Sequence, residues 1–261
     1  MYENYFFDLY GTLVDIRTDE GEPSLWRDVA EFYSLCGARY TSSQLRERYL
    51  ALCAEETAAL ALASPKLGTE GVEIELRNVF RRLFEEKGLT VSDTRVDDTA
   101  VLFRVLSFCR APRLMEGAKE TLEVLRERGA RLYVLSNAQS CFTVPELRSL
   151  GLLEGVFDGI FLSSDFGMRK PAAAFFGAAL RRAGLSASEV LMVGNDPAAD
   201  VCGAASVGME SRYIHTWQSP PRSMPMPESC REIAMLEELL GDSCVATRGL
   251  PLDGQPLGGS H

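Results

Sequence analysis

The stretch YFFDLYGT, residues 5–12, says more about the fold than any other part of the chain. An apolar run over residues 5–7 ends at Asp8, and Gly11-Thr12 follows as a turn signal. This pattern is typical of a buried strand that ends in a tight turn, with its last carboxylate at the carboxyl end of a sheet. Because ligands of open α/β folds bind outside those strand ends, Asp8 is the first candidate functional residue.

Three further blocks repeat this layout of an apolar or loop segment followed by a polar tip. Ser136-Asn137 follows the apolar run 132–135, and Lys170 stands in a loop before Pro171 and a predicted helix over 172–183. In the last block, the run 190–193 leads into Gly194-Asn195-Asp196 and then Asp200. The predicted strands lie near residues 4–8, 131–135, 159–162, 190–193 and 210–214.

In this order and spacing, the four blocks resemble the motifs of the haloacid dehalogenase superfamily, from about Asn4 to Asp242. The resemblance implies that Asp8 is an aspartyl nucleophile and that Lys170 neutralises it and the incoming anion. It makes Ser136 a hydrogen-bond donor to a phosphoryl or carboxylate oxygen. The catalytic residues it implies are Asp8, Thr12, Ser136 and Lys170, and the substrate-binding candidates are Tyr10, Gly11, Asn137, Arg46 and Arg48.

The expected fold class is α/β, with a Rossmann-like, doubly wound parallel sheet and an inserted all-helical cap. Helical periodicity recurs between the first two strands, over 24–36, 42–63, 70–87 and 96–109, where strand signals are nearly absent. Thr41 and Ser92 are plausible helix caps there. We expect a core over 1–16 and 111–242, a cap over 17–110, a helix near 233–240 and a loose tail over 243–261.

The acids of the fourth block predict a magnesium site. Asp196 and Asp200 are four positions apart and should converge with Asp8 at one sheet edge. Clustered carboxylates raise one another's pKa unless a cation lies among them, and Mg²⁺ favours one or two carboxylates together with water. Mg²⁺ would be held by Asp8, the backbone carbonyl of Tyr10 and Asp196, with Asp200 as a ligand or just behind one. Helix capping alone could also account for an acid at this position.

Tyr10 departs from the superfamily's phosphatases, which normally carry a second Asp there as general acid. The loss of acid–base help typically costs about 10²–10⁴-fold in rate. The favoured interpretation is still a Mg²⁺-dependent phosphatase of a small phosphorylated metabolite, acting through an aspartyl-phosphate intermediate. A non-catalytic or regulatory descendant that binds an anion is an alternative. Phosphonate hydrolysis through a cap lysine ranks below both.

A metal-independent 2-haloacid dehalogenase is the sharper alternative, because those enzymes carry the Asp-x-Tyr-Gly-Thr pattern. Their cap supplies an arginine near the substrate, for which Arg46 and Arg48 are candidates, although we favour the interpretation that both face solvent on an amphipathic helix. Two positions count against this alternative. Asp196 supplies a metal-site acid that dehalogenases lack, and their tyrosine six residues after the lysine is Phe176 here.

Composition narrows the partners to small molecules. The net charge of −10 argues against nucleic-acid binding, and no apolar run is long enough to span a bilayer. Seven cysteines without a Cys-x-x-Cys pair are typical of thiols in a reducing compartment. With a start that lacks signal-peptide features, they predict a cytoplasmic enzyme. We expect an anionic small-molecule substrate and a monomer or homodimer.

Overall fold

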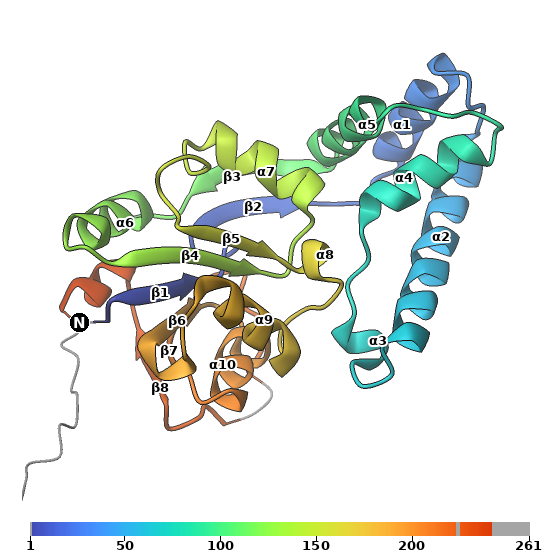
Figure 1. The fold of residues 1–261 in the computed structure, drawn as a ribbon. Coiled ribbons are helices and arrows are strands. Elements are labelled where there is room, and N and C mark those ends of the chain that lie inside the picture. Colours follow the sequence, from blue (N-terminus) through green and yellow to red (C-terminus); the bar gives the residue numbers. More distant parts are fainter. Residues whose placement is uncertain (1, 223–224, 242–261) are drawn as a thin grey trace, which may run out of the picture.

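The core is a six-stranded parallel sheet (Figure 1). The computed structural model describes residues 2–222 and 225–241. In spatial order the strands are β5 (Gly159–Leu162), β4 (Arg131–Ser136), β1 (Asn4–Phe7), β6 (Val190–Gly194), β7 (Glu210–Ile214) and β8 (Cys230–Ile233). Sheet order reverses on either side of β1, so the strand that ends at Asp8 is central and its tip lies at the topological switch point where α/β folds bind ligands.

Strand β1 is buried at every position because both faces of the sheet are covered. Tyr5 and Phe7 point into one cluster of buried side chains, whereas Phe6 points into the other, as alternation along a strand requires. The first cluster packs against α6 (Ala118–Glu127), and the second against α9 (Ala173–Ala183) and α10 (Gly203–Ser206). The α/β, doubly wound fold class is thereby confirmed.

A helical region is inserted between β1 and the rest of the sheet and lies to one side of it (Figure 1). Its helices are α1 (Pro23–Leu35), α2 (Ser42–Ala63), α3 (Gly68–Gly71), α4 (Leu76–Glu85) and α5 (Asp93–Leu106). Thr41 and Ser92 cap α2 and α5, as the sequence predicts. This cap has its own aromatic core, in which the rings of Trp26, Tyr49 and Phe103 pack against one another, so it is a packed unit that can present a rigid surface to the sheet edge.

Two antiparallel strands, β2 (Val14–Thr18) and β3 (Phe108–Leu114), join the cap to the core. Sequence patterns did not predict this ribbon, and they extended the last cap helix to Cys109 where the structure has β3. Both expected domain limits, 16/17 and 110/111, fall inside the ribbon. The ribbon starts directly after the Asp8 turn, so Asp8 and the first cap connection are neighbours along the chain.

Several other elements differ from the sequence prediction. The expected helix over 70–87 is broken, because Val72 and Ile74 lie outside α3 and α4. The expected helix near 233–240 is a 3₁₀ turn, Leu236–Gly241. Ile233 ends β8, a short strand whose two charged residues are adjacent, so it shows no alternation by which it could be recognised. Helix α9 begins at Ala173, two residues after Pro171. The predicted loose tail, 243–261, lies outside the described residues.

The remaining helices of the core follow strand tips. They are α7 (Ser140–Ser149) after β4, α8 (Ser163–Phe166) after β5 and a one-and-a-half-turn π-helix, Pro197–Cys202, after β6. In the part of the chain that the structure describes, no helix is both long and apolar enough to cross a membrane.

Candidate active site

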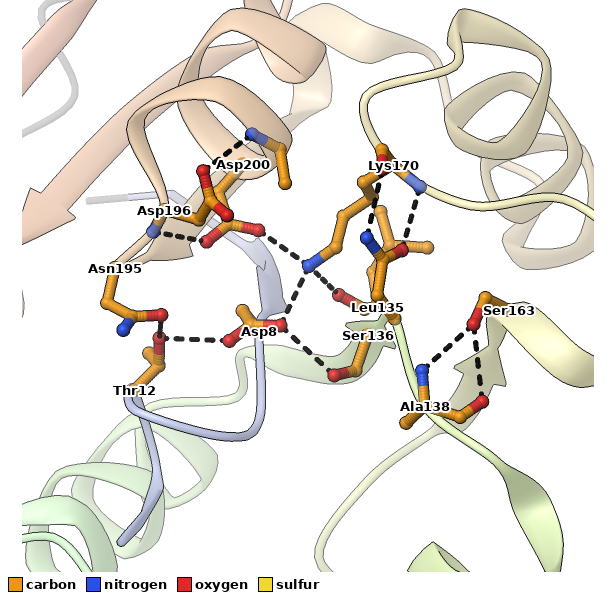
Figure 2. Close-up of polar contacts among 12 residues, drawn as sticks. Asp8, Thr12, Leu135, Ser136, Ala138, Ser163, Lys170, Asn195, Asp196 and Asp200 are labelled. Carbon is orange, nitrogen blue, oxygen red and sulfur yellow. Dashed lines mark hydrogen bonds and ion pairs between the residues drawn. The ribbon is translucent and has the colours of Figure 1, made fainter. Parts of the chain in front are cut away.

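Asp8 lies at the tip of β1, buried among side chains from three other segments (Figure 2). Its Oδ1 accepts hydrogen bonds from Ser136 Oγ at 3.0 Å and from Lys170 Nζ at 2.8 Å. Its Oδ2 accepts only a long bond, 3.3 Å, from Thr12 Oγ1. Oδ2 is therefore the less engaged oxygen and the one with a lone pair free to attack, so the geometry gives Asp8 the form of an oriented nucleophile.

Lys170 is the central cation of the site. Besides Asp8, its Nζ donates to Asp200 Oδ1 at 2.6 Å and to the carbonyl of Leu135 at 2.7 Å, which uses all three ammonium protons. Burial lowers the pKa of Lys170, but the carboxylates of Asp200 and Asp8 outweigh it and hold the pKa above its usual value. Lys170 is therefore charged at neutral pH and neutralises two buried acids.

Asn137 positions Lys170 through the backbone. Its Oδ1 accepts from the Lys170 N–H at 2.8 Å, and its Nδ2 donates to the Lys170 carbonyl at 2.9 Å. Both ends of the Asn137 amide are thus used to fix the lysine, so we assign Asn137 a positioning role in addition to its predicted place at the substrate.

The two acids of the fourth block have different tasks. Asp200 is fully buried, with one oxygen on Lys170 and the other accepting from the Asp196 N–H at 2.9 Å. Burial raises the pKa of Asp200 and the Asp8 charge adds to this, while the Lys170 ammonium opposes both. Asp196 is only partly buried and caps the following helix, because its Oδ1 accepts from the N–H groups of Ala198 and Ala199. The capping alternative is therefore correct for one oxygen of Asp196.

This arrangement narrows the set of metal ligands. No group of three His, Cys, Asp or Glu side chains within the described ranges could hold a metal ion. Because both oxygens of Asp200 are taken, Asp200 supports Lys170 and the Asp196 turn. The Asp8 carboxylate and the second oxygen of Asp196 remain, and the Tyr10 carbonyl belongs to the turn that follows Asp8. Two carboxylates, a carbonyl and water are a donor set that suits Mg²⁺.

Tyr10 turns away from the Asp8 carboxylate and takes part in a buried network with the cap. Its hydroxyl donates to Glu146 Oε2 at 2.5 Å and lies 2.9 Å from Thr143 Oγ1, both on α7. Glu146 Oε1 accepts from Arg104 Nε of cap helix α5 at 2.7 Å. Burial, and next the Glu146 charge, raise the pKa of Tyr10 far above its usual value. A phenol that keeps its proton so firmly, and whose O–H donates a hydrogen bond to Glu146, does not act as the missing general acid.

Gly11 forms the turn that follows. It has a φ of 85°, and a Cβ built there would lie 2.3 Å from Asn195 Nδ2, so both the backbone and the packing require glycine. Its N–H donates to the Val14 carbonyl and its own carbonyl accepts from Thr216, so neither group faces a substrate. The structure thus gives Gly11 a turn-forming role, and corrects its prediction as a substrate ligand.

A cavity of about 320 Å³ lies between the cap and this edge of the sheet. Side chains from both parts line it, among them Tyr10, Asn137, Gln139, Glu73, Arg104 and Arg169. Arg46 and Arg48 are not among its lining residues. Arg46 is exposed, and Arg48 is ion-paired with Glu86 and Glu55 on the outer surface of the cap. Both therefore face solvent, and their prediction as substrate ligands is corrected.

Sequence analysis missed Arg104, Glu146, Glu73 and Gln139. Glu146 carried a usable signal: it lies one helical turn after Phe142, on the buried face of α7, and an acid there needs a partner. Arg104 could then have been proposed as that partner. The sequence around Glu73 and Gln139 carried no such signal, because the roles of these two residues depend on how the cap lies on the core.

Comparison with known proteins places this geometry in a family. The model of the haloacid dehalogenase-like hydrolases matches residues 2–208. The chain belongs to this family. Halopiger xanaduensis ribulose-1,5-bisphosphate 5-phosphatase is 40% identical over 98 residues, covering 38% of this chain and 41% of the relative. Xenopus laevis haloacid dehalogenase-like hydrolase domain-containing protein 3 is 30% identical over 151 residues, covering 58% and 61%. The chain thus spans about half the length of these curated relatives.

Solved structures support the fold. A HAD phosphatase from Thermococcus onnurineus superposes with a TM-score of 0.57 at 21% identity, covering 92% of this chain and 98% of the other. A 2-haloacid dehalogenase from Pseudomonas syringae gives 0.58 at 22% identity, covering 92% and 97%. The putative HAD-hydrolase YfnB of Bacillus subtilis, a structure with bound magnesium, gives 0.50 at 20%, covering 92% and 97%. Since both reaction classes match equally well, the fold does not choose between them.

Proposed function

We propose that this hydrolase is a Mg²⁺-dependent phosphatase of a small phosphorylated metabolite and that Asp8 forms an aspartyl-phosphate intermediate. The observation that carries the proposal is the setting of Asp8, whose Oδ1 is held by Lys170 and Ser136 while Oδ2 is left for attack. Attack joins Oδ2 to phosphorus and expels the leaving oxygen, and water then cleaves the acyl phosphate and restores the carboxylate.

Relatives and the fourth block support phosphate as the substrate group. One relative of Methanothermobacter thermautotrophicus, 31% identical over 132 residues, is a glyceraldehyde 3-phosphate phosphatase. Asp196 keeps a partly exposed carboxylate beside Asp8, at the turn where the resemblance implies a metal ligand. Asp8, Asp196 and the Tyr10 carbonyl would hold Mg²⁺, which would neutralise charge on the phosphoryl oxygens. Lys170 and Ser136 would orient Asp8 and the same oxygens.

Dehalogenation is the second candidate, because Tyr10 matches the dehalogenase pattern. Phe176 weakens it: the side chain is fully buried in the core, packed beneath Gly203, and it carries no hydroxyl. The metal-site acid Asp196 weakens it further. We therefore place dehalogenation behind phosphate ester hydrolysis.

The test is a panel of phosphate esters and 2-haloacids, assayed with Mg²⁺ and with chelator. Phosphate release in Mg²⁺ that disappears in chelator is expected. Halide release that persists in chelator would replace the phosphatase by a dehalogenase. Release of neither product, together with retained anion binding, would instead identify a non-catalytic descendant.

Two variants sharpen this test. Asp8→Asn should abolish turnover and stay folded, whereas Asp98→Asn, on the exposed face of α5, should behave as wild type. Asp196→Asn should raise the Mg²⁺ concentration needed for activity with little loss of stability, because Asn caps a helix as well as Asp does. Wild-type turnover by Asp8→Asn would refute the nucleophile assignment.

A further inference from the structure

The break in the helix predicted over 70–87 is a point of contact between the cap and the core. Val72 forms an isolated antiparallel bridge with Met168. The Arg169 N–H donates to the Gly71 carbonyl at 3.0 Å, and the Glu73 N–H donates to the Gly167 carbonyl at 3.2 Å. The cap segment 71–76 is therefore bound by its backbone to the loop that leads into Lys170. We call this segment the latch.

Gln139 holds the other end of the latch. This residue follows Ser136-Asn137-Ala138 at the tip of β4. Its Oε1 accepts from the Leu76 N–H at 2.9 Å, and its Nε2 donates to the Ile74 carbonyl at 2.9 Å. A side-chain amide that pairs with both backbone groups replaces the helical hydrogen bonds that the segment gives up.

Glu73 places a partly buried carboxylate within the same contact. Its Oε2 accepts from Ser163 Oγ at 3.1 Å, and its Oε1 accepts from Gln139 Nε2 at 3.2 Å. Ser163 Oγ also contacts the backbone N–H and carbonyl of Ala138 (Figure 2). Arg169 Nε of the lysine loop lies 3.9 Å from Glu73 Oε2. The carboxylate therefore joins the latch to the tips of β4 and β5 and to the lysine loop.

The contacts continue without a gap to the nucleophile. Arg169, bound to the latch, directly precedes Lys170, and Gln139 lies two residues after Asn137, which clamps the Lys170 backbone. Lys170 then holds Asp8. Both segments that fix the lysine are thus bound to the cap at adjoining residues.

We infer that Gln139 and Glu73 are positioning residues, which couple docking of the cap to the placement of Lys170 against Asp8. When the cap is docked, the latch fixes the lysine loop, and undocking to admit substrate releases both segments that hold Lys170. Closure of the cap thus places the Lys170 ammonium against Asp8 and also covers the cavity. The inference rests on the proposed function only in giving Lys170 a catalytic task.

Amide hydrogen exchange tests the coupling without any substrate. Gln139→Ala removes three latch bonds, to the Leu76 N–H, the Ile74 carbonyl and Glu73 Oε1, and exchange of the Leu76 N–H should become about tenfold faster. If the latch positions the lysine, the Lys170 N–H, which Gln139 does not touch, should accelerate to a similar extent. Gln44→Ala is the matched control, since Gln44 also binds backbone but in the capping box of α2. Unchanged exchange at Lys170 beside fast exchange at Leu76 would overturn the inference.

Kinetics of the phosphatase reaction supply the second readout. Gln139→Ala and Glu73→Ala should lower kcat about tenfold while changing KM less, because they act on kcat through Lys170 and leave the other residues that line the cavity in place. Glu73→Gln, which keeps hydrogen-bonding groups toward Ser163 and Gln139, should restore most of kcat. A change confined to KM would overturn the positioning role. If wild type releases no phosphate, the proposed function fails, and the exchange experiment still decides the inference.

Discussion

Two ion-pair networks in this molecule use the same chemistry in opposite surroundings. At the sheet edge, Lys170 pairs with Asp8 at 2.8 Å and Asp200 at 2.6 Å, and its side chain is 2% exposed. On the outside of the cap, Arg48 pairs with Glu86 at 2.6 Å and Glu55 at 3.0 Å, and its side chain is 33% exposed. The distances are alike, so burial decides what each network does: losing a partner leaves an uncompensated charge only at the sheet edge.

The largest expected effect comes from Lys170→Met. Removal of the ammonium leaves Asp8 and Asp200 facing each other without a cation, so we expect loss of turnover and a fall of about 3–5 kcal/mol in the free energy of unfolding. Chemical denaturation at neutral pH measures the second quantity. Wild-type stability of Lys170→Met would mean that burial does not make the loss of a partner costlier at the sheet edge than on the cap surface.

Tyr10→Phe should have the next largest effect. The phenyl ring keeps the packing, but Glu146 Oε2 loses its donor in a buried site, which typically costs about 1–3 kcal/mol. Thermal unfolding of the wild type and the variant measures this loss. No loss at Tyr10→Phe would show that Arg104 alone satisfies Glu146.

A pH-dependent effect is expected for Glu73. Burial, which outweighs Arg169 and the two hydrogen bonds, raises the pKa of this carboxyl above its usual value. A raised folded-state pKa means that its contribution to stability is complete below the unfolded pKa and is lost as pH rises through the folded pKa. Glu73→Gln, which does not titrate, should therefore gain Tm relative to wild type between pH 4 and pH 7. A Tm difference that is flat or falls with pH would contradict the raised pKa.

The smallest effect is expected for Arg48→Met on the exposed network. We expect a Tm change below about 2 °C and an unchanged KM, because exposed ion pairs contribute little and Arg48 does not line the cavity. Substrate titration and a thermal melt check both quantities. A several-fold rise in KM would indicate that Arg48 does bind the substrate.

Sequence reasoning succeeded where local pattern and long-range packing agree. The five predicted strands correspond to β1, β4, β5, β6 and β7, because strands covered on both faces contain short apolar runs. The tips of these strands then bring Asp8 and Ser136 together, as parallel strands must, and the loop lysine Lys170 joins them.

Sequence reasoning failed where tertiary contacts override the local pattern. The periodicity over 70–87 is helical, but Gln139 and the lysine loop capture the backbone of residues 71–76. Arg46 and Arg48 were chosen by residue type, since a helix sequence does not say which charged face meets the core. The partner of Tyr10 was equally hidden, because Glu146 lies 136 positions away.

The central place of β1 has a consequence for how the chain folds during synthesis. This strand pairs with β4 and β6, so its second neighbour is made only when residue 190 and beyond have left the ribosome. At about 5–20 residues per second, the aromatic segment Asn4–Phe7 waits roughly 10–40 s with an open edge. During that interval it is an apolar, unpaired strand of the kind that associates between chains. The strand that ends at Asp8 thus benefits from chaperone protection before the sheet closes around it.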